Sequence, residues 1–291
     1  MDYIQLGNMK MSRIVLGCDR YGEQINQETA FSIINEYKLN GGNVLDTARM
    51  YTNGKSEEII GKYLKETNSR NNFYISTKCA HYTANNSRLT RDCILYDVEC
   101  SLKALDVDYI DLLWLHRDDT SKDTVKIMDV LFELTDAGVV KSIGASNWSA
   151  NRIIKANEYA NSINKTGFIA SQILYNMAKC SYIWDDALVY MENPFEKEFY
   201  NNSKMPVFAF SSQAKGFFEK YDNNTLSPKS ADRYYNEESI KTYNTIKSRA
   251  VKNKTTISYE SLDMLIKQSA FEVFPIIGPS NLKQLKSTLN V

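Results

Sequence analysis

The stretch Ile110-Asp-Leu-Leu-Trp-Leu-His116 is a short apolar run that ends on an ionisable side chain. Runs of this length are typical of β-strands. Parallel barrels place their active sites at the carboxyl ends of such strands. Three further segments place polar or ionisable side chains at the ends of apolar runs, namely Asn43-Val-Leu-Asp46-Thr-Ala-Arg-Met-Tyr51, Phe73-Tyr-Ile-Ser-Thr-Lys78 and Val140-Lys-Ser-Ile-Gly-Ala-Ser146-Asn147.

Apolar runs of this kind recur along the whole chain, with amphipathic stretches between them. They begin near Ile14, Val44, Phe73, Ile110, Val140, Phe168, Val207 and Val273. Most starts are about 30 residues apart, which is the length of a strand, a loop, a helix and a second loop. The pattern predicts a closed (β/α)8 TIM barrel forming a single domain over residues 1–291. A doubly wound open sheet is the structural alternative, because periodicity alone does not separate the two.

Polar residues and glycines mark the ends of the predicted helices. Asn26 is placed to cap the first helix, Gly41 and Gly42 to end it, and Ser56 to cap the next one. Apolar residues three and four positions apart give each helix one face for burial. These residues are Ala30, Ile33, Ile34 and Tyr37, then Ile59, Ile60, Tyr63 and Leu64, then Ile94, Val98, Leu102 and Leu105, and then Ile127, Val130, Leu131 and Leu134.

The interval between the last two runs, from Val207 to Val273, is about twice the usual one. It contains a polar stretch, Glu219 to Ser239, before helical spacing resumes near Ile240. Loops of such length are usually functional or mobile. We therefore expect this stretch to form a lid over a site.

Composition excludes several classes of function. The 35 basic residues balance the 35 acidic ones, and no basic stripe interleaved with aromatic residues is present, so a nucleic-acid partner is not expected. The N-terminus has no apolar signal core, and no run of about 18 apolar residues occurs, which predicts a cytoplasmic protein without a membrane span. Five scattered cysteines and two histidines, His81 and His116, predict buried thiols and no metal site.

Several nucleotide-binding and hydrolytic motifs are missing from the sequence. The glycines do not form the G-x-G-x-x-G fingerprint of a Rossmann fold. The phosphate-binding loop G-x-x-x-x-G-K-[ST] and the hydrolase elbow G-x-S-x-G are also absent from the sequence. No Rossmann fold is therefore expected.

Four ionisable residues lie at or just beyond the ends of the second, third and fourth predicted strands. They are Asp46, Tyr51, Lys78 and His116. If the strands form a barrel, a carboxylate, a phenol, an ammonium and an imidazole converge at one mouth. Convergent ionisable groups shift one another's pKa values, and such clusters are typical of catalytic sites.

The ordered motifs resemble those of the aldo-keto reductase family over nearly the whole chain. The matching segments are Asp46-Thr-Ala-x-x-Tyr51 with Ser56-Glu57, Ser76-Thr77-Lys78, Asp111-Leu-Leu-x-Leu-His116, Gly144-x-Ser146-Asn147, Gln172-x-x-Tyr175-Asn176 and Pro275-Ile-Ile-Gly278. The resemblance implies a (β/α)8 barrel that binds NADP(H), or alternatively NAD(H), without a Rossmann fold. It also implies reduction of an aldehyde, ketone or sugar to an alcohol, or the reverse reaction.

The resemblance places the catalytic tetrad of the family on Asp46, Tyr51, Lys78 and His116. Tyr51 is then the proton donor, and His116 directs the substrate carbonyl. A phenol has a pKa of about 10, and a neighbouring ammonium lowers that value. We therefore expect Lys78 to lower the pKa of Tyr51 and Asp46 to hold Lys78 in its charged form.

The resemblance also implies a set of residues that bind the cofactor. Ser146, Asn147 and Gln172 are expected at the nicotinamide carboxamide, and Phe210 is expected to stack on the nicotinamide ring. The stretch from Ser211 to Gly216, which includes Lys215, is expected to cover the pyrophosphate.

The segment Gly278-Pro-Ser280-Asn281-Leu-Lys283-Gln284 is expected at the cofactor's 2'-phosphate. The positions that commonly carry Arg or Lys in the family hold small or neutral residues here. Ser280 is expected to cap the following helix, whose N-terminus attracts phosphate, with Lys283 as an extra charge. NADP(H) is the first expectation and NAD(H) the second.

Loop residues near the tetrad are candidates for the substrate pocket. They are Asp19, Arg20, Tyr21, Tyr82, Arg117 and Trp148. Arginine favours carboxylate or phosphate, so Arg117 beside His116 favours a sugar, polyol or acidic carbonyl substrate. The functional alternative is a cofactor-binding regulatory or scaffold barrel similar to the potassium-channel β subunits.

Overall fold

The computed structural model describes residues 1–83 and 86–291. Within these residues, eight parallel strands close into a barrel, which confirms the predicted fold and rules out the open-sheet alternative. A closed barrel has no edge strands, and all its carboxyl ends meet at one mouth. The barrel strands are β3 (Val15–Gly17), β4 (Val44–Asp46), β5 (Tyr74–Cys79), β6 (Ile110–Leu115), β7 (Val140–Ser146), β8 (Ser171–Leu174), β9 (Val207–Phe210) and β10 (Val273–Ile277).

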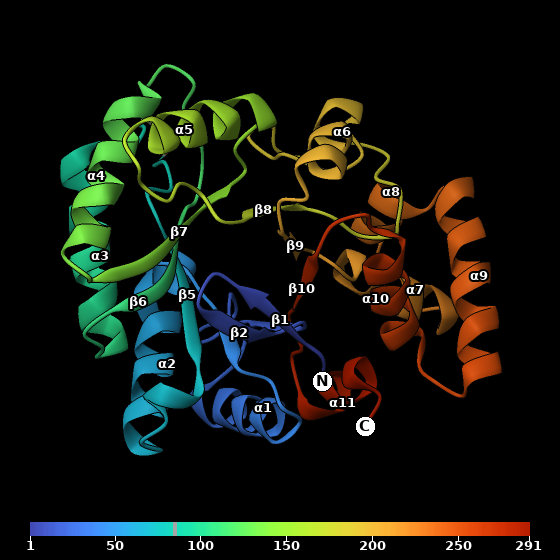
Figure 1. Ribbon diagram of the computed structural model, residues 1–291. Helices are drawn as coiled ribbons and strands as arrows, with labels where there is room; N and C mark the ends of the chain where they lie inside the picture. Colours follow the sequence, from blue (N-terminus) through green and yellow to red (C-terminus); the bar gives the residue numbers. More distant parts are fainter. Residues whose placement is uncertain (84–85) are drawn as a thin grey trace.

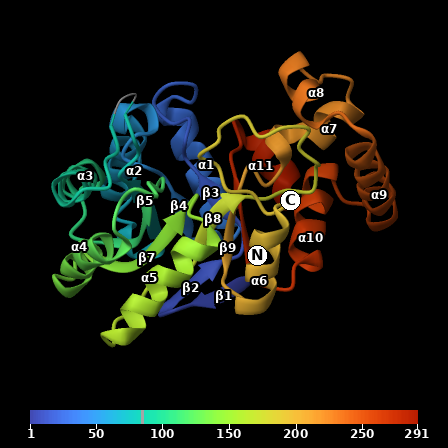
Figure 2. The ribbon, with the colours of Figure 1, turned by 90° about the horizontal axis from the view of Figure 1, so that it is seen from above.

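Helices link the strands and lie around the outside of the barrel (Figure 1). In the described chain they are α1 (Gln27–Leu39), α2 (Lys55–Glu66), α3 (Arg91–Leu105), α4 (Thr124–Asp136), α5 (Ala150–Ser162), α6 (Pro194–Ser203), α7 (Phe217–Asp222), α8 (Pro228–Tyr234), α9 (Glu237–Asn253), α10 (Ile257–Gln268) and α11 (Leu282–Leu289). Three single turns of 3-10 helix are η1 (Tyr51–Gly54), η2 (Arg70–Asn72) and η3 (Ala214–Gly216). Figure 2 shows α3 to α5 on one side of the strands and α8 to α10 on the opposite side.

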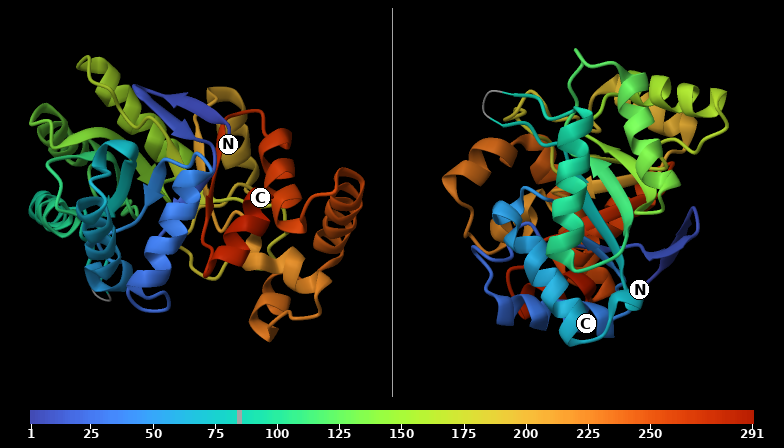
Figure 3. Two further views of the ribbon diagram at one scale, coloured as in Figure 1. Left: turned by 90° about the horizontal axis from the view of Figure 1, so that it is seen from below. Right: turned by 90° about the vertical axis from the view of Figure 1, so that its left-hand side faces the viewer.

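A two-stranded antiparallel hairpin precedes the barrel, and the sequence interpretation missed it. Its strands are β1 (Tyr3–Leu6) and β2 (Met9–Ser12), and they lie outside the barrel strands in Figure 3. Gly7 takes the turn with a φ of 56°, a conformation that glycine adopts readily. Met11 is fully buried with Val15 and Val44, the first residues of β3 and β4, so the hairpin covers the amino end of the barrel.

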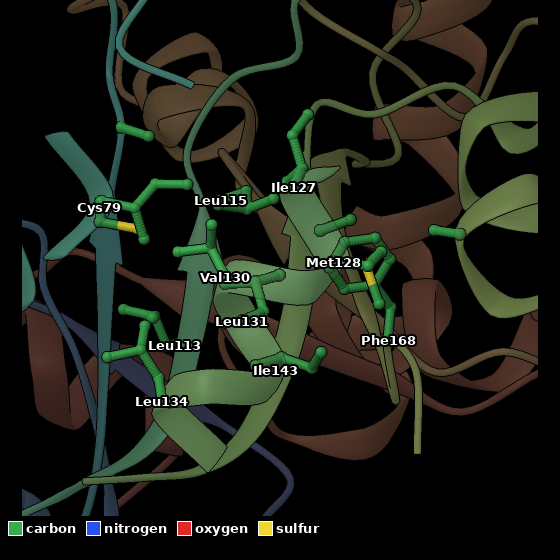
Figure 4. Close-up of a cluster of buried hydrophobic side chains, with 14 of the residues drawn as sticks. Cys79, Leu113, Leu115, Ile127, Met128, Val130, Leu131, Leu134, Ile143 and Phe168 are labelled. Atoms are coloured by element: carbon green, nitrogen blue, oxygen red, sulfur yellow. The ribbon is translucent and has the colours of Figure 1, made fainter. Parts of the chain in front are cut away.

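The strand β6 divides its side chains between two cores. Leu112 and Trp114 pack in the barrel interior with Phe208, whereas Leu113 and Leu115 pack outward against the helices. This alternation follows from the two-residue period of a strand. Figure 4 shows the outer core, in which the predicted apolar face of α4 lies against β5 to β7.

The predicted helix ends are partly confirmed. Asn26 caps α1 by accepting a hydrogen bond from the amide of Thr29 at 2.9 Å. Ser56 does not cap α2, because the N-cap of that helix is Gly54 and Ser56 lies inside the first turn. The buried hydroxyl of Ser56 instead donates to the carbonyl of Cys18 at 2.7 Å and ties α2 to the loop after β3.

The stretch Glu219 to Ser239 is mostly helical and is not the long loop that the sequence predicted. The helices α7 and α8 occupy most of it, and Ser227 caps α8, which begins with Pro228. Proline is well suited to the first turn of a helix. Phe217, the first residue of α7, and Tyr234, the last residue of α8, pack together in one buried cluster.

The cysteines are free thiols, and two of the five, Cys18 and Cys79, are buried. Cys93, Cys100 and Cys180 are half-buried, so the prediction of buried thiols is only partly correct. Among the described residues, no helix is both long enough and apolar enough to cross a bilayer.

Candidate active site

Three neighbouring strands bring the predicted tetrad together at the carboxyl end of the barrel. Asp46 is the last residue of β4, Lys78 lies in β5, and His116 follows β6. Tyr51 begins η1, which continues the chain from β4. The Tyr51 and His116 rings meet edge to face with centroids 5.7 Å apart, and the Lys78 Nζ lies 4.8 Å from the centroid of the Tyr51 ring.

Lys78 is buried in a network of hydrogen bonds. Its Nζ lies 2.6 Å from Oδ2 of Asp46 and donates to the carbonyl of Thr47 at 2.7 Å. The second oxygen of Asp46 accepts hydrogen bonds from Ser76 Oγ at 2.8 Å and from Gln172 Nε2 at 3.1 Å. Buried ionic groups require this kind of pairing, because each desolvated charge is costly when it has no partner.

The electrostatics of Tyr51 and Lys78 differ in part from the sequence prediction. Burial raises the pKa of the Tyr51 hydroxyl, and the Lys78 ammonium offsets only part of that shift, so the expected lowering is not seen. Burial lowers the pKa of Lys78, but the Asp46 carboxylate and the Tyr51 phenol more than offset this effect, and the net shift is upward. At neutral pH the site therefore contains a protonated phenol beside a protonated amine.

His116 is a neutral imidazole in this environment. Burial lowers its pKa well below the usual value, and the charges of Lys78 and Arg117 lower it further. Its Nδ1 is buried and has no hydrogen-bond partner among the described residues, so Nε2 is the nitrogen available to the cavity.

His81, a residue that the sequence interpretation did not place in the site, lies next to His116. The two imidazole rings meet edge to face with centroids 4.7 Å apart. The Nδ1 of His81 lies 2.9 Å from the carbonyl oxygen of Tyr82, which can only accept, so Nδ1 carries a proton. Burial lowers the pKa of His81, and the neutral ring therefore keeps Nε2 as a hydrogen-bond acceptor. In the sequence, the feature that could have placed His81 in the site is its position three residues after Lys78.

A cavity of about 980 Å³ opens at this end of the barrel. Asp46, Tyr51 and His116 line it, whereas Lys78 lies behind them. Most of the residues predicted to bind the cofactor also line it, namely Ser146, Asn147, Gln172, Phe210, Ser211, Gly216, Gly278, Ser280 and Gln284, whereas Lys283 does not. The carboxyl ends of β7, β8, β9 and β10 bring these residues to the cavity from far apart in the sequence.

The polar residues expected at the carboxamide are already linked to the tetrad. Besides its bond from Nε2 to Asp46, Gln172 is buried in β8 beside Ser146 of β7. Asn147 donates to Ser146 Oγ at 3.1 Å and to the carbonyl of His116 at 3.4 Å. It has a φ of 56°, a left-handed conformation that asparagine tolerates better than most residues. These contacts fix the side chains before any ligand is bound.

The segment after β10 differs in detail from the prediction. Asn281, and not Ser280, caps α11, because its Oδ1 accepts the hydrogen bond from the amide of Gln284 at 3.0 Å. The hydroxyl of Ser280 instead accepts a hydrogen bond from Nη1 of Arg20 at 2.6 Å. Arg20 therefore turns toward the predicted phosphate end of the cavity.

The predicted substrate residues separate into different environments. Asp19, Arg20 and Arg117 line the large cavity, whereas Tyr82 lines a neighbouring cavity of about 570 Å³ that also reaches Arg117. Tyr21 and Trp148 line neither cavity. Tyr21 packs with residues of the core around α1, and Trp148 packs against Phe168 and donates from Nε1 to the carbonyl of Arg117. Both are large and apolar enough to be buried in the core.

Two acidic residues of the sequence motifs stabilise the scaffold. Glu57 accepts a hydrogen bond from Thr77 at 2.7 Å and pairs with Arg49 at 2.7 Å, which joins α2 to β5. Asp111 pairs with Arg70 at 2.8 Å and accepts from the amide of Ile75. These contacts hold the strands that carry the tetrad.

A model of the aldo/keto reductase family matches residues 13–291, which include every barrel strand. The chain belongs to the aldo/keto reductase family.

Individual relatives match this chain at moderate identity. A probable voltage-gated potassium channel subunit beta of Arabidopsis thaliana is 35% identical over 186 residues, which cover 61% of this chain and 56% of that protein. Norsolorinic acid reductase B of Dothistroma septosporum is 30% identical over 201 residues, or 61% of this chain and 50% of that protein. The chain thus spans about half the length of these relatives. An aldo-keto reductase of Alternaria alternata is 27% identical over 99% of this chain and 86% of its own.

Proposed function

We propose that this chain catalyses the NAD(P)H-dependent reduction of a carbonyl group to an alcohol, or the reverse reaction, with Tyr51 as the proton donor. The observation that carries the proposal is the buried contact series from Asp46 through Lys78 to Tyr51, with His116 against the same phenol. Asp46, Tyr51 and His116 face one cavity, and the buried Lys78 lies behind them. Family membership supports the same assignment.

The cavity fits an extended dinucleotide. Its volume of about 980 Å³ lies at the upper end of typical ligand pockets, and it extends from the tetrad to the segment between Gly278 and Gln284. Phe210 offers an aromatic face near the tetrad, and Ser146 and Asn147 offer hydrogen-bonding groups. NADP(H) is the preferred cofactor and NAD(H) the second choice.

A reduced nicotinamide held by Ser146, Asn147, Gln172 and Phe210 would supply a hydride to the carbonyl carbon. Tyr51 donates its proton to the carbonyl oxygen, so the C=O bond becomes an alcohol and the phenol becomes a phenolate. The Lys78 ammonium stabilises that phenolate as it forms, and Asp46 holds Lys78 in place. With its proton on Nε2, the neutral His116 donates a hydrogen bond to the same carbonyl oxygen and orients it. Lys78 thus acts at the phenolate oxygen of Tyr51, and His116 acts at the carbonyl oxygen of the substrate.

The polar side chains beside His116 favour a hydroxylated or anionic carbonyl compound, such as a sugar, a polyol in the reverse reaction or an acidic carbonyl. Nη1 of Arg117 donates to the carbonyl of His116 at 3.2 Å, and Nη2 lies 3.5 Å from Asp185. A guanidinium held in this place can bind a carboxylate or phosphate. The acceptor Nε2 of His81 suits a substrate hydroxyl next to the reacting carbonyl.

A second candidate is a cofactor-binding regulatory or scaffold barrel. The match to the Arabidopsis protein named as a probable channel subunit beta favours it. Both candidates bind a nicotinamide cofactor, and they differ in whether substrate turnover depends on Tyr51.

Tryptophan fluorescence provides the first test, because Trp184 lines the large cavity. The purified chain is titrated with NADPH and NADH, with Trp184→Phe as the control for the reporter. A screen of sugars, polyols and acidic carbonyls then follows the consumption of NAD(P)H. Saturable quenching with turnover supports the reductase, and saturable quenching without turnover favours the regulatory barrel. If neither cofactor binds at millimolar concentration, both candidates are wrong.

A further inference from the structure

Trp114 begins a series of hydrogen bonds inside the barrel that reaches the tetrad. It lies in β6 opposite Lys78 of β5 in the strand register, and its indole packs in the barrel interior with Phe208. Nε1 of the indole donates to Ser76 Oγ at 2.6 Å, and Ser76 Oγ donates to Oδ1 of Asp46 at 2.8 Å. Trp114 and Ser76 are fully buried and Asp46 is 3% exposed, so the series lies away from bulk water.

The protons in this series have one possible direction. An indole N–H donates and has no acceptor, whereas an ionised carboxylate accepts and has no donor. Because Trp114 gives its proton to the Ser76 oxygen, the Ser76 hydroxyl gives its own proton to Asp46. Gln172 Nε2 donates to the same Oδ1 at 3.1 Å, and the other carboxylate oxygen, Oδ2, lies 2.6 Å from Lys78 Nζ. Both oxygens of the carboxylate are therefore held in place.

The neighbouring strand β7 leaves room for the indole at this point. Gly144 pairs with Trp114 in the register of β6 and β7, and a Cβ atom on Gly144 would lie 2.4 Å from the indole ring. Carbon atoms in contact are about 3.5–4.0 Å apart, so a larger residue would displace the ring from Ser76. The Phe208 ring meets the indole edge to face with centroids 5.0 Å apart. The surrounding residues thus fix the indole where its N–H reaches Ser76.

We propose that Trp114 and Ser76 are positioning residues that fix the Asp46 carboxylate for the reduction. They act on the phenol of Tyr51 through the ammonium of Lys78. This inference rests on the proposed function and extends the reacting group inward to β6. Hydrogen bonds that a carboxylate accepts favour its charged form, and they are stronger than bonds between neutral groups. The series therefore keeps the Lys78 ammonium where it stabilises the phenolate that Tyr51 forms.

Initial rates of glyceraldehyde reduction by NADPH test this role. Ser76→Ala removes the hydroxyl and should lower kcat by about 10- to 100-fold, the range for a hydrogen bond to a charged group. Trp114→Phe removes the N–H, keeps an aromatic ring and should lower kcat by about two- to tenfold, since its bond is to a neutral group. Because Trp114 acts through Ser76, the double variant should lose no more than Ser76→Ala alone. Ser76→Thr keeps the hydroxyl and should recover most of kcat, and KM for NADPH should be unchanged throughout.

The pH profile separates a positioning role from a packing role. Oxidation of glycerol by NADP⁺ requires the phenolate of Tyr51, and a less firmly held Lys78 stabilises that phenolate less. The pH at half-maximal rate should therefore rise in Ser76→Ala, by about one unit for each tenfold loss of this stabilisation. Ser171→Ala is the matched control, because Ser171 is a fully buried serine of β8 that bonds to the Tyr200 hydroxyl at 2.8 Å. It should change neither kcat nor the pH profile.

The indole N–H signals provide a readout that needs no turnover. The three tryptophans are Trp114, Trp148 and Trp184, and Trp114→Phe identifies the Trp114 signal in a ¹H–¹⁵N spectrum by its loss. We expect this signal to move upfield in Ser76→Ala, because the N–H loses its acceptor, while the other two indole signals stay in place. The same signals show whether the variant is folded.

Three results would overturn the inference. One is an unmoved Trp114 signal in Ser76→Ala. Another is a wild-type kcat and pH profile in folded Ser76→Ala. The third is a double variant whose loss equals the product of the two single losses. If the wild type reduces no carbonyl compound and binds neither cofactor, the proposed function and this inference fail together, whereas an active wild type with an equally active Ser76→Ala refutes the positioning role alone.

Discussion

The Nζ of Lys78 lies 2.6 Å from Oδ2 of Asp46, and both side chains are almost completely buried. This ion pair lies directly behind Tyr51 and is the only part of the described tetrad with two formal charges of opposite sign. It stabilises the phenolate that Tyr51 forms on losing a proton. Breaking it is costly because both side chains are almost completely buried.

Asp46→Asn should destabilise the fold and reduce turnover together. Removal of one partner from a buried ion pair leaves an uncompensated charge and typically costs about 3–5 kcal/mol. Without the carboxylate, burial dominates and the pKa of Lys78 falls, so the ammonium that stabilises phenolate is lost. Urea unfolding and kcat measure the two effects. Glu99→Gln, which removes an exposed pair with Lys103, is the control and should leave the unfolding midpoint unchanged. A fully active Asp46→Asn would contradict this account.

The stability of the protein should fall as the pH drops below about 6.5, in part because of His116. Its folded pKa is lowered by burial, so in this range the unfolded chain binds a proton that the folded chain does not. Each pH unit between the two pKa values then costs about 1.4 kcal/mol for this group. Urea midpoints at pH 7.5, 6.5 and 5.5 should show a steeper decline in the wild type than in His116→Gln. Equal slopes in the two proteins would show that His116 is not neutral in the folded state.

His81→Phe should lower kcat/KM for aldehydes that carry a hydroxyl beside the carbonyl more than for aldehydes without it. The variant removes an acceptor next to His116 and keeps an aromatic ring of similar size. A neutral hydrogen bond contributes about 0.5–1.5 kcal/mol, so we expect a selective loss of roughly two- to tenfold. Glyceraldehyde and propanal form a suitable pair of substrates. His81→Gln, which keeps an acceptor, should recover part of the preference, and an equal loss on both substrates would argue for a packing role.

Arg117→Met should raise KM for anionic carbonyl compounds selectively. The guanidinium lies beside His116 and borders both cavities, so its loss removes positive charge where a carboxylate or phosphate would bind. An interaction with a charged group contributes about 1.5–3 kcal/mol, which corresponds to roughly 10- to 100-fold in KM. Initial rates on an anionic and an uncharged carbonyl compound give the comparison. A uniform effect on both would mean that Arg117 supports the loop and does not select the substrate.

The barrel could be predicted from the sequence because its signals are local and repeated. Each apolar run is long enough to be recognised, and Asn26 and the apolar faces of the helices follow simple spacing rules. The β1–β2 hairpin was missed because each strand has four residues and only the Gly7-Asn8 turn marks it. The sequence predicts a loop over Glu219 to Ser239 because its helices are short and polar. Tertiary packing of Phe217 and Tyr234 decides their conformation.

The candidate site was predictable in part for a similar reason. Residues at strand ends, such as Asp46 and His116, converge once the barrel closes, and their positions follow from the topology. The side-chain directions of loop residues were less predictable. No local sequence pattern indicates that Trp148 packs in the core or that Arg20 points toward Ser280. The direction of the Tyr51 pKa shift also depends on burial, which composition and spacing do not reveal.

The most direct test of the central claim compares Tyr51→Phe with the wild type in cofactor binding and in carbonyl reduction. General acid catalysis typically contributes about 100- to 10,000-fold, so we predict a loss of that size in kcat, with NADPH affinity within twofold of the wild type. Tyr51 contacts the Lys78 ammonium through its ring, which the substitution keeps, and the fold should therefore remain intact. A variant that binds NADPH normally and reduces the substrate at an unchanged rate would contradict the assignment of Tyr51 as the proton donor.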